Sequence, residues 1–176
     1  MKSLLRLTVL LVCFQLSAQS TPWSTDLMTT PELTNYQKTS TYAEVMDFIK
    51  AIQSKSNLVH LEFMGTSKEG KDIPVVVMAN PKVSSPEEAK KSNKPVMYVQ
   101  GNIHSGEVEG KEILQQLMRD ILLGDKKYLL DNQIIIFAPI YNTDSNDKME
   151  KGRRPSQEDS PVEVGIRANS QGFDLN

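Results

Sequence analysis

The 176-residue sequence contains a single cysteine, Cys13, and only two histidines, His60 and His104. Because Cys13 lies among the first twenty residues, the rest of the chain cannot form a disulfide. It must therefore be stabilised by its hydrophobic core or by a metal. Basic residues are not in excess, since 20 lysines and arginines stand against 22 aspartates and glutamates. A nucleic-acid-binding protein needs a basic face, so this charge balance argues against that class of function.

Extended apolar runs are also rare, and the most prominent one lies at the N-terminus. Lys2 and Arg6 begin a stretch whose residues 7–16 are mostly apolar, well short of the roughly 20 residues that span a bilayer. Ala18-Gln-Ser20 then offers small residues at the positions that a signal peptidase recognises. We therefore predict a secretory signal peptide over residues 1–20, cleaved near Ala18–Ser20.

Export of the mature chain follows from this prediction, with a secreted or periplasmic location. Cleavage would remove two basic residues and no acidic ones, which leaves 18 basic and 22 acidic residues. No membrane span is expected in the mature chain. A lipid anchor on Cys13 is the less favoured alternative, because this cysteine lies inside the apolar run and no small residue directly precedes it.

Hydrophobic periodicity predicts alternating helices and strands in the rest of the chain. Thr41 and Glu44 form a capping-box pattern before apolar residues at helical spacing, which predicts a helix over residues 42–55. Residues 58–64 and 73–79 predict an antiparallel pair of strands. In chain order, the remaining predictions are a surface loop over 80–95, a buried strand over 95–100, an amphipathic helix ending at Gly124, a buried strand over 133–140, and a long loop from Tyr141 onward.

This order of elements predicts an α/β sandwich around a mixed sheet. Residues 21–40 are rich in Thr, Ser and Pro and show no period, so we interpret them as an N-terminal extension that lies over the domain. The folded domain is expected over residues 41–176. The loop charges Lys151, Arg153 and Arg154 are interpreted as a solvated cluster, with an anion-binding or substrate-binding patch as the alternative.

His104 and Glu107 are the candidate metal ligands. They lie three residues apart, directly after a predicted strand, with Gly101 before the pair and Gly106 between its two members. Imidazole nitrogen and carboxylate oxygen both suit zinc, at roughly 2.0–2.2 Å. On its own the pair is a weak signal, and the alternative is a surface histidine beside a glutamate at a helix N-terminus.

The surroundings of the pair resemble the zinc carboxypeptidases, the carboxypeptidase A-like metallopeptidases. Three segments carry the resemblance, in the family's order and at sensible separations. They are Gly101-Asn-Ile-His104-Ser-Gly-Glu107-Val-Glu-Gly-Lys-Glu112, Ala138-Pro-Ile-Tyr-Asn142-Thr-Asp144, and Arg167-Ala-Asn-Ser-Gln-Gly172-Phe-Asp174-Leu-Asn176.

The resemblance implies a mixed-sheet α/β/α sandwich of the zinc carboxypeptidase type, with Zn²⁺ as the cofactor and peptide or protein C-termini as substrates. It implies that His104 and Glu107 are zinc ligands. Arg167 would stabilise the oxyanion, a role that needs a fixed positive donor aimed at developing negative charge. Asn176 would bind the terminal carboxylate of the substrate. Arg167 would contact the substrate too, so it is both a catalytic and a substrate-binding candidate.

Several features of the family pattern have no counterpart in the sequence. The family's third zinc ligand is a later histidine, its general base is a later glutamate, and its carboxylate-binding arginine follows the position of Asn176. His60 lies in a predicted strand and is interpreted as a structural residue. We therefore expect residues 41–176 to be the N-terminal part of a catalytic domain that is incomplete at its C-terminus, inactive alone and weak in zinc binding.

Two alternatives remain open from the sequence. One is a related zinc-dependent deacylase of the aspartoacylase or succinylglutamate desuccinylase kind, although the run Glu107–Glu112 and the Arg167 segment look closer to the peptidases. The other is a secreted binding domain that keeps the scaffold without turnover.

Overall fold

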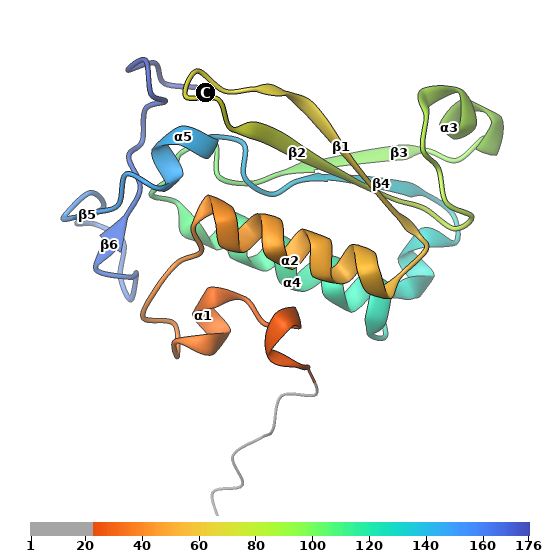
Figure 1. Ribbon diagram of the computed structural model, residues 1–176, viewed down its shortest axis with the longest axis horizontal. Coiled ribbons are helices and arrows are strands. Elements are labelled where there is room, and N and C mark those ends of the chain that lie inside the picture. The colour runs from red at the N-terminus through yellow and green to blue at the C-terminus, as the bar shows by residue number, and fades with distance from the viewer. Residues whose placement is uncertain (1–22) are drawn as a thin grey trace, which may run out of the picture.

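A mixed sheet is the centre of the computed structural model, which describes residues 23–176 (Figure 1). Within that range its four strands lie in the order β1-β2-β4-β3. β1 and β4 both run antiparallel to β2, whereas β3 and β4 run parallel. The mixed sheet and the antiparallel first pair confirm the sequence predictions. The strands are β1 (Val59–Thr66), β2 (Asp72–Met78), β3 (Val96–Gln100) and β4 (Ile134–Ala138).

Two long helices, α2 (Tyr42–Lys55) and α4 (Val108–Leu123), cover one face of this sheet side by side (Figure 1). The capping box predicted at the start of α2 is present, with the Thr41 side chain accepting from the Glu44 amide. The apolar stripes of both helices face the sheet, which is the arrangement that buries both amphipathic faces. The core between them includes Val45, Ile49, Ile52, Val76, Met78, Met118, Ile121 and Phe137.

β3 differs from its prediction as a buried strand. Val96, Met97 and Tyr98 are each about half exposed, at 51%, 50% and 50%. Among the described strands, β3 pairs with β4 alone and so forms an edge of the sheet. An apolar run predicts a strand, but whether other elements cover it depends on the tertiary arrangement. β4, between β2 and β3, has the buried character that was predicted.

The predicted surface loop over residues 80–95 contains a helix, α3 (Pro86–Ser92). Ser85 accepts a hydrogen bond from the Glu88 amide at its N-terminus, and Asn93 ends it in the left-handed region. These local signals were present in the sequence, since serine before proline and glutamate is a typical helix start. Smaller elements are η1 (Thr25–Leu27), α1 (Thr30–Leu33), η2 (Lys127–Leu130), α5 (Thr143–Asn146), β5 (Glu150–Lys151) and β6 (Glu163–Val164).

The part of the N-terminal extension that the structure describes is tied to α4 by Arg119. This buried side chain donates to both carboxylate oxygens of Glu32, each at 2.8 Å, and to the carbonyl of Leu27 at 2.7 Å. Its guanidinium also lies over the ring of Trp23. The predicted signal peptide, residues 1–20, lies outside the described residues. From residue 23 onward, the structure contains no helix with the length and apolar character needed to cross a membrane.

Candidate active site

The carboxyl ends of β3 and β4 lie side by side because the two strands are parallel. Beyond the strands the pairing continues into the two following loops. The Gly101 amide donates to the Ala138 carbonyl at 2.9 Å, and the Tyr141 and Asn142 amides donate to Gly101 and Asn102 at 3.1 and 3.0 Å. Ligand-binding crevices commonly form at this edge of an α/β sheet. The two loops here carry the first two segments on which the family resemblance rests.

A close approach between Gly101 and Gly110 brings the start of α4 against the end of β3. A Cβ atom on Gly101 would lie 2.9 Å from the carbonyl carbon of Gly110, so a larger residue would force the helix away. The short loop between strand and helix holds His104 and Glu107, and the Glu107 amide donates to the His104 carbonyl at 2.9 Å. Backbone packing therefore sets the positions of both candidate ligands.

His104 and Glu107 face each other, as the metal-ligand hypothesis requires. His104 is 4% exposed. Its Nδ1 atom lies 3.2 Å from Oε1 of Glu107. Two ligands that each lie about 2.0–2.2 Å from a tetrahedral zinc are roughly 3.3–3.6 Å apart. The observed separation is close to that range, so this pair of donor atoms fits two positions of a zinc site.

The other ring nitrogen of His104 is engaged by Asp174, a residue that the sequence interpretation did not assign to the site. Asp174 Oδ1 lies 2.8 Å from His104 Nε2. A carboxylate on the outer nitrogen of a metal-binding histidine orients the ring and increases its basicity. Because Asp174 approaches the nitrogen that points away from Glu107, it suits this supporting role rather than that of a further ligand to the same metal.

Arg167, predicted from the resemblance, joins the same cluster. Its Nε donates to Asp174 Oδ2 at 2.9 Å, and its Nη1 lies 3.7 Å from Glu107 Oε1. The guanidinium is about half exposed, so it is available to an incoming group. Asn176 is exposed, and its main-chain amide donates to Asp174 Oδ1 at 3.2 Å. The four residues predicted from the sequence therefore gather at one end of the sheet.

Arg154 was predicted to belong to a solvated charge cluster, but in the structure its side chain turns toward Glu107. Its Nη2 donates to Glu107 Oε1, and its side chain packs where a Cβ on Gly106 would stand. Burial alone would raise the pKa of Glu107, but hydrogen bonds from His104 and Arg154 outweigh it and hold that pKa below its usual value. Arg153 and Lys151 are exposed, as predicted. Nothing local to residues 151–155 signals which arginine turns inward.

His60 stays apart from this cluster. It lies in β1, where its Nε2 is 3.4 Å from Glu62 Oε2. From residue 23 onward, no three His, Cys, Asp or Glu side chains are grouped so that they could hold a metal ion. Within that range, His104 and Glu107 remain a pair of candidate ligands without a third His, Cys, Asp or Glu grouped with them to hold a metal.

The pairing of Asp174 should persist to unusually low pH. The hydrogen bond from His104, reinforced by the Asn176 amide and Arg167, lowers the pKa of Asp174 from 3.8 to about 2. A depressed carboxyl pKa means that the interaction is fully present above 3.8 and is lost as the pH falls through about 2. We expect a carboxyl ¹³C titration midpoint near that lower value, rising toward 3.8 in His104→Leu. A wild-type midpoint at or above the ordinary value would contradict the arrangement.

Comparison with known proteins identifies the family. A sequence model described as zinc carboxypeptidase matches residues 45–176. The chain belongs to the zinc carboxypeptidase family. No curated protein sequence matches it.

Solved structures with this fold include members from bacteria and mammals. A metallo-carboxypeptidase from Burkholderia cenocepacia is 18% identical with a TM-score of 0.58, over 80% of this chain and 33% of that one. A metallo-carboxypeptidase from Pseudomonas aeruginosa is 18% identical with a TM-score of 0.56, over 80% and 32%. Bovine thrombin-activatable fibrinolysis inhibitor is 17% identical with a TM-score of 0.56, over 81% and 43%. These likenesses confirm the carboxypeptidase-type α/β fold. The chain spans less than half the length of each of these proteins.

Proposed function

We propose that this chain carries part of the active site of a secreted zinc metallocarboxypeptidase, which hydrolyses the last peptide bond of peptide or protein substrates. The supporting observation is the convergence of two distant segments at the carboxyl ends of β3 and β4. One provides His104 and Glu107, and the other provides Arg167 and Asp174, with His104 and Asp174 in contact at 2.8 Å. Export rests on the signal-peptide pattern of residues 1–20.

In this proposal, His104 Nδ1 and the Glu107 carboxylate hold the metal, and Asp174 fixes the histidine ring through Nε2. Bound zinc would supply Lewis acidity, which activates water and polarises a carbonyl group. Arg167 directs its guanidinium toward the same space and stabilises negative charge on the carbonyl oxygen of the scissile bond. Asn176 hydrogen-bonds the free carboxylate of the substrate, which selects chain ends over internal peptide bonds.

Neither a third zinc ligand nor a general base is grouped with His104 and Glu107 among the described residues. A catalytic zinc site has three protein ligands and one open position. With two ligands, the 176-residue chain should bind zinc far more weakly than structural sites, whose binding free energies are about 10–16 kcal/mol. It should also show no peptidase turnover. The family match favours this activity over that of a related deacylase.

Calorimetric titration of zinc into the 176-residue chain tests the assignment of ligands. We expect weak, saturable binding that falls about 100-fold or more in His104→Ala, since even outer-shell changes cost about 10–100-fold. The control is His60→Ala, which removes the other histidine and should leave the zinc affinity unchanged. Equal zinc affinity in wild type and His104→Ala would show that the metal site lies elsewhere, and tight stoichiometric binding would contradict the two-ligand site.

A further inference from the structure

Arg167 and Asp174 lie at the two ends of one closed turn. The Asn169 side chain closes it, since its Oδ1 accepts from the amides of Gln171 at 3.0 Å and Phe173 at 2.9 Å. The Asn169 amide donates to the Phe173 carbonyl at 2.8 Å. Because the turn is held by its own hydrogen bonds, its position constrains the flanking residues Arg167 and Asp174. We call residues 169–173 the 169–173 turn.

Asp144 connects the 169–173 turn to the body of the fold. The Ser170 hydroxyl donates to Asp144 Oδ2 at 2.7 Å. Asp144 is 4% exposed and lies in α5, directly after the loop that follows β4. The segment has other ties to the body of the fold. The Ile166 amide donates to the Ser145 carbonyl at 3.2 Å, and Asp174 contacts His104 at 2.8 Å. The Asn142 side-chain amide donates to the Arg167 and Ala168 carbonyls, each at 3.4 Å.

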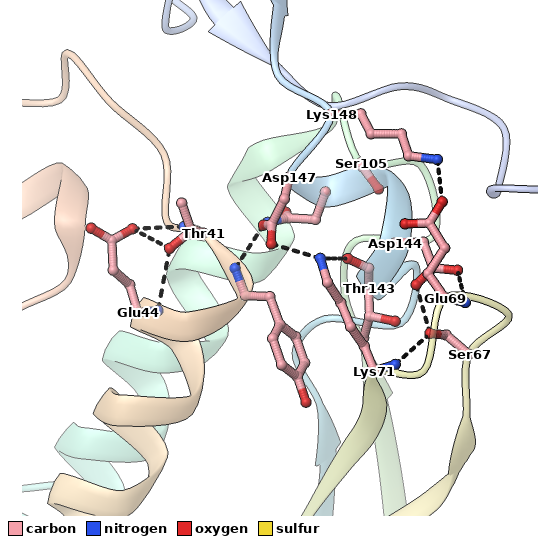
Figure 2. Close-up of polar contacts among 12 residues, drawn as sticks. Thr41, Glu44, Ser67, Glu69, Lys71, Ser105, Thr143, Asp144, Asp147 and Lys148 are labelled. Atoms are coloured by element: carbon pink, nitrogen blue, oxygen red, sulfur yellow. Dashed lines mark hydrogen bonds and ion pairs between the residues drawn. The ribbon is translucent and has the colours of Figure 1, made fainter.

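The same carboxylate also grips the connection between β1 and β2. The Ser67 hydroxyl donates to Asp144 Oδ1 at 2.6 Å, and the Glu69 amide donates to Oδ2 at 3.2 Å. Ser67 is itself fixed, because its hydroxyl accepts from the Lys71 amide at 2.9 Å. Figure 2 shows Asp144 pointing from α5 toward this connection, with Ser67 and Glu69 around it. Asp144 thus joins three segments that are far apart in the sequence.

The donors around Asp144 suit a permanently charged carboxylate. Burial opposes the charge, but hydrogen bonds from Ser67, Ser170 and the Glu69 amide outweigh it, so the pKa of Asp144 stays below its usual value. Hydrogen bonds to an ionised acceptor are roughly twice as strong as neutral ones. The hydrogen bonds from Ser67, Ser170 and the Glu69 amide therefore keep Asp144 ionised at neutral pH. The nearby charge of Lys71 also lowers the pKa of Asp144, although the Lys71 amine is bonded to Asp147 at 2.7 Å and to the Thr143 carbonyl at 3.3 Å (Figure 2).

We propose that Asp144 is a positioning residue for the active site. Its carboxylate fixes the 169–173 turn on the connection between β1 and β2, and so places Arg167 and Asp174 against Glu107 and His104. Without it, Ser170 would lose its bond to the body of the fold, and the turn would be held only from its two flanks, by Ile166 and Asn142 on one side and Asp174 on the other. The catalytic meaning of this placement rests on the proposed function, whereas the mechanical link does not.

NMR of the Arg167 side chain tests the link in the 176-residue chain. In wild type the Arg167 Nε–H donates to Asp174 at 2.9 Å, so its exchange with water should be slow. We expect this exchange to be about tenfold faster in Asp144→Ala, because local opening becomes easier. The matched control is Asp147→Ala. Asp147 bonds Lys71, the Tyr42 amide and Asn146, but has no contact with the turn, so the Arg167 signal should be unchanged.

Ser170→Ala provides the second variant, which keeps Asp144 bonded to Ser67 and Glu69 and so should preserve the fold. We expect it to accelerate Arg167 exchange as Asp144→Ala does. A purely structural role would lower the unfolding midpoints of Asp144→Ala and Asp147→Ala alike and leave the Arg167 signal of Ser170→Ala at its wild-type rate. That result would overturn the proposal.

Zinc titration of the same samples separates this proposal from the proposed function. If Asp144 positions the turn and the metal site is correct, Asp144→Ala and Ser170→Ala should both bind zinc about tenfold more weakly, since the Asp174 carboxylate on His104 is displaced. Faster Arg167 exchange in a chain that binds no zinc at His104 would support the positioning role and refute the zinc assignment. Unchanged Arg167 exchange in variants that still bind zinc at His104 would support the zinc assignment and refute the positioning role.

Discussion

Glu112→Gln is expected to lower the free energy of unfolding by about 3–5 kcal/mol, the usual loss when one partner of a buried ion pair is removed. Glu112 is buried on α4, and its carboxylate lies 3.5 Å from the amine of Lys111, which is 0% exposed. Burial lowers the pKa of Lys111 despite this neighbour. In the variant, the Lys111 charge would have no counter-ion within that distance.

Glu112 also satisfies donors from the N-terminal extension. Its Oε1 accepts from the Thr39 hydroxyl at 2.6 Å and the Ser40 amide at 2.7 Å, and its Oε2 accepts from the Ser40 hydroxyl at 2.7 Å. The amide group of glutamine would turn two of its own hydrogens toward these donors, which leaves buried polar atoms unsatisfied. Lys111 meanwhile donates to the Ser40 carbonyl and to Asn146, so the same network reaches α5.

Urea unfolding followed by circular dichroism measures this effect, with slopes compared to check that both proteins unfold in the same way. Glu109→Gln is the matched control, because Glu109 is exposed on the same helix and should change stability by no more than about 0.5 kcal/mol. If Glu112→Gln were as stable as Glu109→Gln, the buried network would contribute nothing to stability.

Gly165→Ala should be the second large effect, with a loss of about 3 kcal/mol, at the upper end of the usual cost of overpacking. A Cβ atom at this position would lie 2.6 Å from Ser105 Cβ and 2.6 Å from the Ser145 carbonyl oxygen. Neither a backbone oxygen nor the tightly held loop beside His104 can yield without moving other atoms. The segment that begins at Gly165 would therefore shift away from the candidate ligands.

Gly65→Ala serves as the control, because a Cβ there meets no atom within 4 Å. We expect Gly65→Ala to stay within about 0.5 kcal/mol of wild type in the same urea titration. Amide chemical shifts of Ser105 should move in Gly165→Ala and not in Gly65→Ala. Equal stability of the two variants would contradict the close packing at Gly165.

Most of the regular structure was predictable, because it depends on periods of a few residues. The capping box at Thr41 and Glu44 and the apolar spacing after it predicted α2, and the helix α4 ends where Gly124 indicated. The helix α3 could have been found in the same way from Ser85, Pro86 and Glu88. The exposure of strand β3 could not be predicted, because an apolar strand has the same sequence pattern whether or not another element covers it.

Some residues of the candidate site were likewise predictable from local patterns, and others were not. His104, Glu107, Arg167 and Asn176 were identified from ordered motifs, which are local strings with recognisable spacing. Asp174 lay within one of those strings without an assigned role. Arg154 was interpreted wrongly, since a loop arginine is usually solvated, and its turn toward Glu107 depends on the space that Gly106 leaves.

The sequence by itself determined the helices α2 and α4, the strand segments, and the candidate zinc pair His104 and Glu107, because periodicity and short motifs are properties of neighbouring residues. Only the tertiary structure decided that Asp174 meets the far side of His104 across 70 positions and that Asp144 joins Ser67 to Ser170. Contacts over such separations arise from how strands and helices pack, and no local pattern encodes which distant side chain will meet a given carboxylate.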